Sequence, residues 1–508
     1  MVTEPIHSAS PNGASSLLSF PARSLTGKQR HDLARRVLTG EATVTDLART
    51  HEVSRKFVYQ QVDKGKAALE QAFEEAVGDE EVWFYLPVTK AWLRQVVLGL
   101  VLLCHGSFRG VIEFFRDLLD TPISLGSVQG IVNEAVERAR RVNAVQELSA
   151  VRVGSHDELF QAGRPVLAGL DLESTYCYLL VASDQRDGDT WAIHLLDLKA
   201  QGLEPAYTVA DGGTGLRAGQ AHAWPGVPCR SDVFHALQQI GQLTTRLENR
   251  AYRAIGAREA LEKKMHRAKR RGQGRAWSKR LAEARAEAAR RGHLASAVAT
   301  LGEWLQRDIL ALAGPDAATR TQLYDFVMAA LNDLEPAARR LIHPVRRSLV
   351  NQRDTLLAFA QDLDEQLQRL AQRFEVSVEP LRQMLALQEQ APTHPDYWPQ
   401  ALALHPQLQG QFYAIDQALH ELRRHLHRAS SLVENFNSRL RNYFFLRRQI
   451  GNRYLDLLRF FLNHHPFARS HHPHRRGKTP AELLTGQPHA HWLELLGFTP
   501  FQRKRLAL

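Results

Sequence analysis

The chain of 508 residues is longer than one compact core, and its length predicts three or four folded units. With 44% hydrophobic residues, 23% charged residues and a net charge of +11, its composition is that of a soluble globular protein with a polyanionic partner. The longest apolar run, residues 96–104, is about half as long as a segment that spans a bilayer, and the N-terminus lacks a secretory pattern. The three cysteines are widely spaced and fit neither a disulfide framework nor a zinc ribbon. Membrane and secreted classes are therefore excluded, and we expect a cytoplasmic protein.

The N-terminal part combines a polar arm with a helix-turn-helix pattern. Residues 1–23 are rich in Ser, Pro, Ala and Gly and predict a flexible arm. Within residues 24–75, Thr26 caps a first helix, a short second helix follows, and Ser54 caps a third helix that reaches Gly65. The alternative to a DNA-binding unit is a three-helix bundle without DNA contact. If the unit binds DNA, the third helix presents polar and basic groups to a groove through Arg55, Lys56, Tyr59 and Gln60.

A second helical unit is expected at residues 80–148. Ser107 begins one helix, Thr121 and the proline after it end that helix, and Ser124 or Ser127 caps the next. This rhythm fits either a second DNA-contacting module or a support for the first.

Residues 149–240 change from helical to strand periodicity. Val153, Ser155 and Asp157 alternate along one face, as in a strand. The order strand–strand–strand–helix–strand is that of the first half of an RNase H-like domain. Its expected members are the strand with Asp157, strands at 165–172 and 175–183, a helix at 191–201 capped by Asp189 or Thr190, and a strand at 206–211 that ends at Asp211.

The same order selects between two candidates for the first acidic site residue. If Asp171 were on the first strand, only one more strand would precede the helix. Placing Asp157 there gives the full three-strand meander and leaves Asp171 near a hairpin turn. We therefore favour Asp157.

Residues 241–428 are almost wholly helical and charged, and they predict a large all-α domain inserted into the core. The stretch from Lys263 to Arg280 contains no acidic residue. It is either a solvated helical face or a surface that contacts the DNA backbone. In the second case the contacting residues would be Lys263, Lys264, Arg267, Lys269, Arg270 and Arg271.

The chain returns to the core in residues 429–508. An apolar helical stripe that includes Val433 and Leu440 lies beside a face that carries Glu434, Asn437 and Arg441. The loop that follows the next helix offers cations for phosphates, namely Arg475, Arg476 and Lys478. A zinc site is disfavoured because no cysteine or defined ligand spacing accompanies the histidines at 464, 465, 471, 472 and 474.

Three acidic residues therefore occupy three different settings. Asp157 lies on a strand, Asp211 at the end of a strand, and Glu434 on a distant helix. Such a set can hold two divalent metals about 4 Å apart for phosphoryl transfer. The expected fold is multidomain, with N-terminal all-α helix-turn-helix units and an α/β RNase H-like core split by a large all-α insertion.

The motifs around these acids resemble those of the DDE transposases, the Mutator-like group in particular. Those proteins show an Asp followed by Gly and then Gly-Leu at the second acid, as at 211–216 here. A short Asp-x-x-His signature follows, matched by Asp232 and His235, and a helix with Glu, Asn and a downstream Arg is matched by Glu434, Asn437 and Arg441. The resemblance covers roughly residues 150–485.

The resemblance implies a bacterial DNA transposase, located at the nucleoid, that binds element ends and catalyses strand cleavage and strand transfer on double-stranded DNA. It implies two Mg²⁺ or Mn²⁺ ions on Asp157, Asp211 and Glu434, and a homodimer or higher oligomer on DNA. Support at the site would come from Asp232, His235, Asn437 and Arg441. The alternatives are a nuclease or integrase on the same core that does not transpose, and a domesticated DNA-binding regulator without catalysis.

Overall fold

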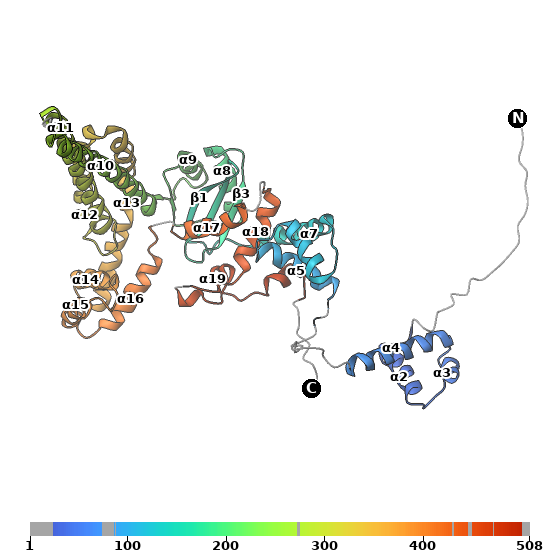
Figure 1. Ribbon diagram of the computed structural model, residues 1–508. Helices are drawn as coiled ribbons and strands as arrows, with labels where there is room; N and C mark the ends of the chain where they lie inside the picture. Colours follow the sequence, from blue (N-terminus) through green and yellow to red (C-terminus); the bar gives the residue numbers. More distant parts are fainter. Residues whose placement is uncertain are drawn as a thin grey trace, which may run out of the picture. The chain divides into compact units, whose positions relative to one another are not determined.

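The computed structural model describes residues 24–73, 86, 88–271, 275–428, 431–445, 450–470 and 472–499. The chain is mostly helical, with one five-stranded sheet (Figure 1). It divides into two compact units, the first Met1–Pro87 with Arg503–Leu508 and the second Val88–Gln502. The expected N-terminal arm, residues 1–23, lies outside the described residues.

The first unit is built from α2 (Gly27–Leu38), α3 (Val44–Thr50) and α4 (Arg55–Phe73). The expected caps are confirmed, because Thr26 Oγ1 accepts from Gln29 N at 3.3 Å and Ser54 Oγ accepts from Phe57 N at 3.1 Å. The three helices enclose a small core of their own, made by Leu33, Leu47, Ala48, Val58 and Val62.

The third helix was expected to end near Gly65. Instead, α4 continues to Phe73. Gly65 lies where α4 crosses α2, and a Cβ at this position would come within 3.1 Å of Leu38 Cδ1 and 3.2 Å of Ala34 Cβ. The glycine therefore provides close helix packing rather than a helix end.

The sheet of the second unit has the order β3-β2-β1-β4-β5. The pairs β1–β2 and β2–β3 are antiparallel, whereas β1–β4 and β4–β5 are parallel. The expected order strand–strand–strand–helix–strand is confirmed. The bounds are β1 (Val153–Gln161), β2 (Arg164–Asp171), β3 (Cys177–Ala182), α8 (Gly188–Ala200), β4 (Tyr207–Ala210) and β5 (Cys229–Ser231).

Helix α8 begins earlier than expected. Its cap is Asp187, whose Oδ1 accepts from Thr190 N at 2.9 Å. The expected caps, Asp189 and Thr190, instead lie within the helix. All three residues are of types that cap helices. Asp187 takes the role because its side chain reaches the backbone N–H three residues ahead.

Helices cover both faces of the sheet. One hydrophobic cluster joins the sheet to α5 (Lys90–Leu102), α6 (Phe108–Leu119), α7 (Leu125–Val145), α17 (Ser431–Phe445), α18 (Asn452–His464) and α20 (Trp492–Leu495). The other face is covered by α8, α9 (Thr214–Ala223) and α19 (Pro480–Thr485). The helices from residues 90–145 thus share one core with the sheet, and of their two candidate caps it is Ser124 that begins α7.

In its described ranges, the segment between β5 and α17 consists of helices and connecting loops without a strand, in agreement with the expected all-α insertion. It comprises α10 (Val233–Lys269), α11 (Arg275–Trp304), a π-helical turn (Leu305–Ile309), α12 (Ala317–Leu334), α13 (Arg339–Phe374), α14 (Val378–Gln388), α15 (Tyr397–Leu404) and α16 (Phe412–His425), with short 3₁₀ turns at Glu335–Ala337 and Pro406–Leu408. Two hydrophobic clusters of its own stabilise it. The segment leaves and rejoins the sheet at one place, because Val233 N donates to Arg428 O at 3.1 Å.

Candidate active site

The register of the two parallel strands brings Asp157 and Asp211 together. Ser155 on β1 pairs with Val209 on β4, and His156 pairs with Ala210. Asp157 and Asp211 are the next residues along these neighbouring strands, which lie about 4.8 Å apart in any sheet. Two acids separated by more than fifty positions in sequence therefore lie side by side where β4 ends beside the middle of β1.

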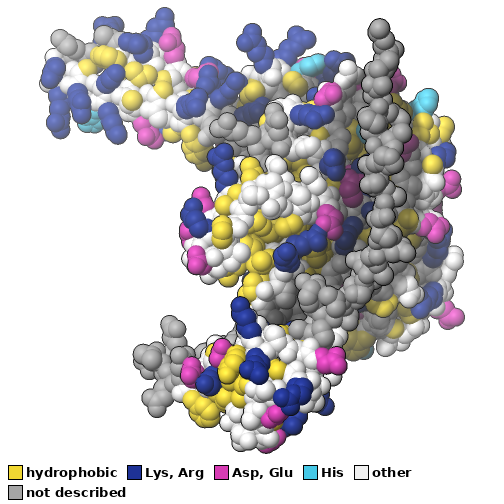
Figure 2. Space-filling view, turned by 90° about the vertical axis from the view of Figure 1, so that its right-hand side faces the viewer, with side chains coloured by type: hydrophobic (Ala, Val, Ile, Leu, Met, Phe, Trp, Pro, Cys, Tyr) yellow, Lys and Arg dark blue, Asp and Glu magenta, His cyan; other side chains and the backbone are white. Residues whose placement is uncertain are grey.

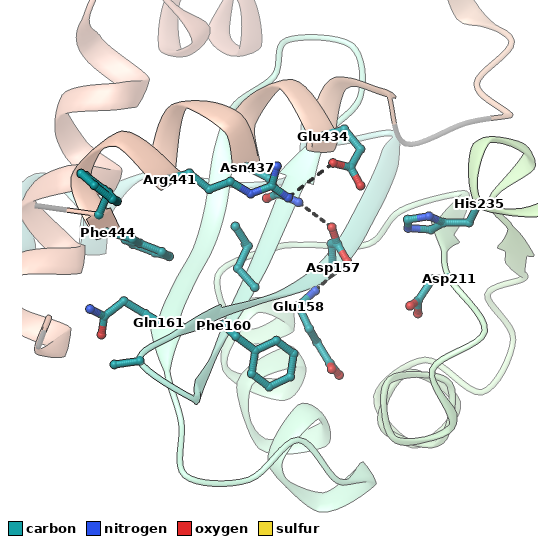
Figure 3. Close-up of a pocket in the computed structure, with 13 residues that line it drawn as sticks. Asp157, Glu158, Phe160, Gln161, Asp211, His235, Glu434, Asn437, Arg441 and Phe444 are labelled. Carbon is teal, nitrogen blue, oxygen red and sulfur yellow. Dashed lines mark hydrogen bonds and ion pairs between the residues drawn. The ribbon is translucent and has the colours of Figure 1, made fainter. Parts of the chain in front are cut away.

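The first turn of α10 adds a histidine to this pair. Asp232 caps the helix, since its Oδ1 accepts from Phe234 N at 2.8 Å, and His235 follows within the same turn. Asp157, Asp211 and His235 each offer one ligand atom, and these three atoms lie within 4.8 Å of one another. No other group of this kind occurs in the described parts of the chain. Figure 3 shows the His235 ring directed at the two carboxylates.

Asp157 is the most constrained member of the group. Its Oδ1 accepts from Glu158 N at 2.8 Å, and its Oδ2 accepts from Asn437 Nδ2 at 2.6 Å. The residue is 9% exposed. Burial raises the pKa of Asp157 to about 6, although these two hydrogen bonds and His235 oppose the shift. The carboxylate is thus fixed in place, and its negative charge is poorly solvated.

Helix α17 supplies the opposite wall of the same cavity. Glu434, Asn437 and Arg441 recur on one side of the helix and face the strands (Figure 3). Arg441 Nη2 lies 3.9 Å from Glu434 Oε2. The cavity, of about 670 Å³, is lined by both aspartates, His235 and these three residues. Glu434 lies in this cavity but outside the group of atoms within 4.8 Å.

The sequence did not point to the aromatic rim of the cavity. Phe160, Phe444 and Phe445 line it, and Phe445 is 91% exposed. In the sequence, Phe444 falls on the apolar stripe of Val433 and Leu440, which predicts a core position for it. The available signal was the second phenylalanine, because two adjacent aromatic residues cannot both face one core from a helix.

Glu158, next to Asp157, has structural partners. Its Oε1 accepts from Trp191 Nε1 at 3.1 Å, and its Oε2 forms a 2.8 Å ion pair with Arg186 Nη1.

Asp171 lies near a turn, as expected, where its Oδ2 accepts from Ser174 N at 2.7 Å and Ser174 Oγ at 2.5 Å. Asp171 does not line the cavity with Asp157. Of the two candidates, the structure places Asp157 with the other site residues.

The expected DNA-contacting residues lie on accessible surfaces. Arg55, Lys56, Tyr59 and Gln60 are exposed on α4. The cations of the basic stretch are exposed at the end of α10, on the arm at the upper left of Figure 2: Lys263, Lys264, Arg267, Lys269, Arg270 and Arg271.

The C-terminal cations and histidines have local roles. Arg475 Nη2 donates to Glu173 O at 3.0 Å and Arg476 Nε to Ser470 O at 3.0 Å, while Lys478 is exposed. His464 Nδ1 donates to Phe460 O at 2.8 Å. Across the described residues, no group with metal-ligand spacing includes a histidine of this loop, and His471 lies outside them.

Neither a protein-family model nor a curated protein matches the chain. None of the helices in the described ranges has both the length and the apolar character needed to cross a membrane. A function must therefore be argued from the geometry of the cavity.

Proposed function

We propose that the chain is a metal-dependent DNA transposase of the DDE type, which cleaves DNA strands and transfers them to a new site. The observation that carries the proposal is the convergence of Asp157, Asp211 and His235 in an open cavity that Glu434 also lines. These residues come from two strands and two helices, and the motifs around them are those that resemble the DDE transposases.

The donor set fits a divalent cation. The carboxylates, without a thiolate beside them, suit Mg²⁺ or Mn²⁺, which prefer oxygen ligands. The charge of Asp157 is disfavoured by burial, and a cation would favour it. Asp157 and Asp211 would hold the ions from the strand side, Glu434 from the helix side, and His235 as a further ligand. Two such ions, when bound, stabilise the attacking and leaving oxygens of an in-line displacement at phosphorus.

The surrounding residues have distinct tasks. Asn437 orients Asp157 through its 2.6 Å hydrogen bond. Asp232 places His235 by capping α10, and its Oδ2 lies 3.7 Å from His235 Nε2. Arg441 offers a cation to the phosphate backbone at the same cavity, where it now faces Glu434. These groups position charge for the reaction, which is most of what phosphoryl transfer requires.

Two further features support the proposal. The element order around Asp157 and Asp211 is the one expected for an RNase H-like core, with a helical segment inserted before Glu434. The three-helix first unit presents exposed basic and polar residues on α4, as a unit that recognises element ends requires.

The test is a strand-nicking assay with the full chain on DNA that carries the sequences flanking its gene. We expect cleavage in Mg²⁺ or Mn²⁺ that EDTA abolishes, and at least a hundredfold loss in Asp157→Asn, Asp211→Asn and Glu434→Gln with DNA binding retained. Asp171→Asn is the matched control and should cut normally. Joining of paired ends separates a transposase from a nuclease, and a folded wild type that never cuts in metal would overturn the proposal.

A further inference from the structure

A second pocket flanks the catalytic helix on its other side. Its volume is about 270 Å³, and three of its lining residues are arginines: Arg439 on α17 and Arg469 and Arg475 in the loop after α18. The rest of the lining contains no Asp or Glu. Such a small, positively lined pocket suits one compact anion rather than a whole nucleotide.

Within the described ranges, the three arginines have no carboxylate counter-ion of their own. Among the described residues, none of them forms an ion pair with a carboxylate. Arg475 Nη2 donates to the backbone oxygen of Glu173, and its Nε is buried without a described partner. Burial lowers the pKa of Arg439. Because a guanidinium stays charged in proteins, a desolvated one without a carboxylate gains stability when it binds an anion.

Neighbouring charges add to the positive character. Burial and, after it, the charge of Arg439 lower the pKa values of His105 and His465. Burial lowers the pKa of Arg475, the charge of Arg424 lowers it further, and Asp171 opposes the shift. The pocket therefore lies in a locally cationic part of the second unit.

The position of the pocket on α17 connects it with the active site. Arg439 lies about 140° around the helix axis from Glu434, so one helix separates the two pockets. The exposed side between them carries the uncharged polar residues Asn435, Ser438 and Asn442. A DNA strand that crosses this side of the helix meets hydrogen-bonding groups and no negatively charged side chain.

We propose that the pocket lined by Arg439, Arg469 and Arg475 binds a backbone phosphate of the DNA strand, and that another phosphate of the same strand enters the cavity of Asp157 and Asp211. This inference rests on the proposed function and adds a second anchor for the substrate strand. Arginine suits the role because its planar fork can bind two phosphate oxygens at once.

The experiment measures DNA binding by the full chain in EDTA, with a labelled single-stranded oligonucleotide over a range of salt concentrations. Arg439→Gln and the exposed Arg469→Gln should each weaken binding about tenfold, as loss of a charge-assisted hydrogen bond does. Each should lower the slope of log affinity against log salt by about one. Arg340→Gln, which removes an exposed arginine outside the pocket, should leave both quantities unchanged.

A second arm separates DNA phosphate from free phosphate. Replacing chloride by inorganic phosphate at constant ionic strength should weaken DNA binding by the wild type and have no further effect in Arg439→Gln. If phosphate raises the Tm of the wild type while both variants keep the wild-type DNA affinity, the pocket holds a free anion and the DNA assignment is wrong. Folded variants with the wild-type salt slope and no response to phosphate would also overturn it.

The metal-free readout keeps this inference distinct from the proposed function. A protein that never cleaves DNA but shows the expected losses in Arg439→Gln and Arg469→Gln retains the phosphate pocket and loses the transposase assignment. A protein that cleaves DNA and shows neither loss retains the transposase assignment and loses the pocket.

Discussion

At the scale of single residues, the candidate site is held in an arrangement that costs stability. Asp157 is buried, lies beside Asp211, and has its pKa raised to about 6 by burial. At neutral pH the ionised form therefore lowers the free energy of unfolding in the absence of metal. Strained carboxylates of this kind occur where a cation or a substrate is meant to bind.

Asp157→Asn should accordingly raise the stability of the metal-free protein at pH 7.5, by about 1–2 kcal/mol. The substitution keeps the shape and one acceptor oxygen, so that it retains one of the two hydrogen bonds from Glu158 N and Asn437 Nδ2, and it removes the poorly solvated charge. Mg²⁺ or Mn²⁺ should raise the Tm of the wild type by mass action and leave that of Asp157→Asn almost unchanged. Thermal unfolding with and without metal measures both effects; an equal metal response in the two proteins would exclude Asp157 as a ligand.

A second residue-scale prediction concerns pH and a group outside the site. Burial lowers the pKa of His464 to about 4, while its ring stacks on Phe460. Of the charged neighbours, His489 lowers this pKa further and Glu482 opposes it. Because the folded pKa lies below the unfolded value of about 6.5, the stabilisation is complete above pH 6.5 and is lost as the pH falls toward 4.

His464→Gln should remove this part of the acid sensitivity. Between pH 7.5 and 5 the wild type should lose about 2 kcal/mol more of its free energy of unfolding than the variant does. Urea unfolding at both pH values checks this difference. His222→Gln, at an exposed position, should follow the wild type, and parallel curves for all three proteins would contradict the assignment.

At the scale of elements, caps and crossings decide where each helix begins and how far it runs. Thr26, Ser54 and Ser124 cap helices as their types predict, since each side chain accepts from a backbone N–H three residues on. Gly65 resembles a helix end in sequence but allows α4 to cross α2 closely. A local signal is reliable where its partner is local, and it misleads where the partner belongs to another helix.

At this scale, we expect helix α4 to recognise the element ends. In the full chain, Arg55→Ala and Gln60→Ala should weaken binding to element ends by about 1–3 kcal/mol each and reduce discrimination against random DNA, if these exposed side chains read bases. Competition binding at several salt concentrations measures the discrimination. Lys28→Ala on α2 is an exposed control from the same unit. Equal losses on end and random DNA would reduce α4 to a non-specific contact.

At the scale of the whole molecule, the helical insertion begins and ends near the end of β4, where the candidate site lies. Val233 N meets Arg428 O where the segment leaves and returns, and Asp362 on α13 pairs with Arg230 on β5. Helix α10 begins with the turn that carries His235 and ends at the basic stretch. One continuous helix, α10, therefore joins the site to the basic stretch (Figure 1).

Neutralising that arm should weaken DNA binding without unfolding the protein. The six cations to be replaced by Gln are Lys263, Lys264, Arg267, Lys269, Arg270 and Arg271. The variant should show a flatter salt dependence of DNA affinity, because fewer counter-ions are released on binding. The Tm should hardly change, because these side chains are exposed and exposed charges contribute little to folding. A folded variant with an unchanged salt slope would leave the arm as a solvated surface.

The sequence by itself determined most elements and their order. The alternation around Asp157, the caps at Thr26, Ser54 and Ser124, and the apolar stripe of α17 are local patterns, and each has its expected element. The choice of Asp157 over Asp171 for the first strand also followed from chain order alone, and Asp171 does cap a turn. These features depend on neighbours within a few residues, which a sequence displays directly.

Tertiary structure alone decided which side chains meet. The approach of His235 to Asp157 and Asp211 depends on strand register and on the angle at which α10 leaves the sheet. The sharing of one core by residues 90–145 and the sheet, and the arginine pocket behind α17, are likewise products of packing. Contacts between residues far apart in sequence are set by the burial of shared apolar surface, and no local pattern records them.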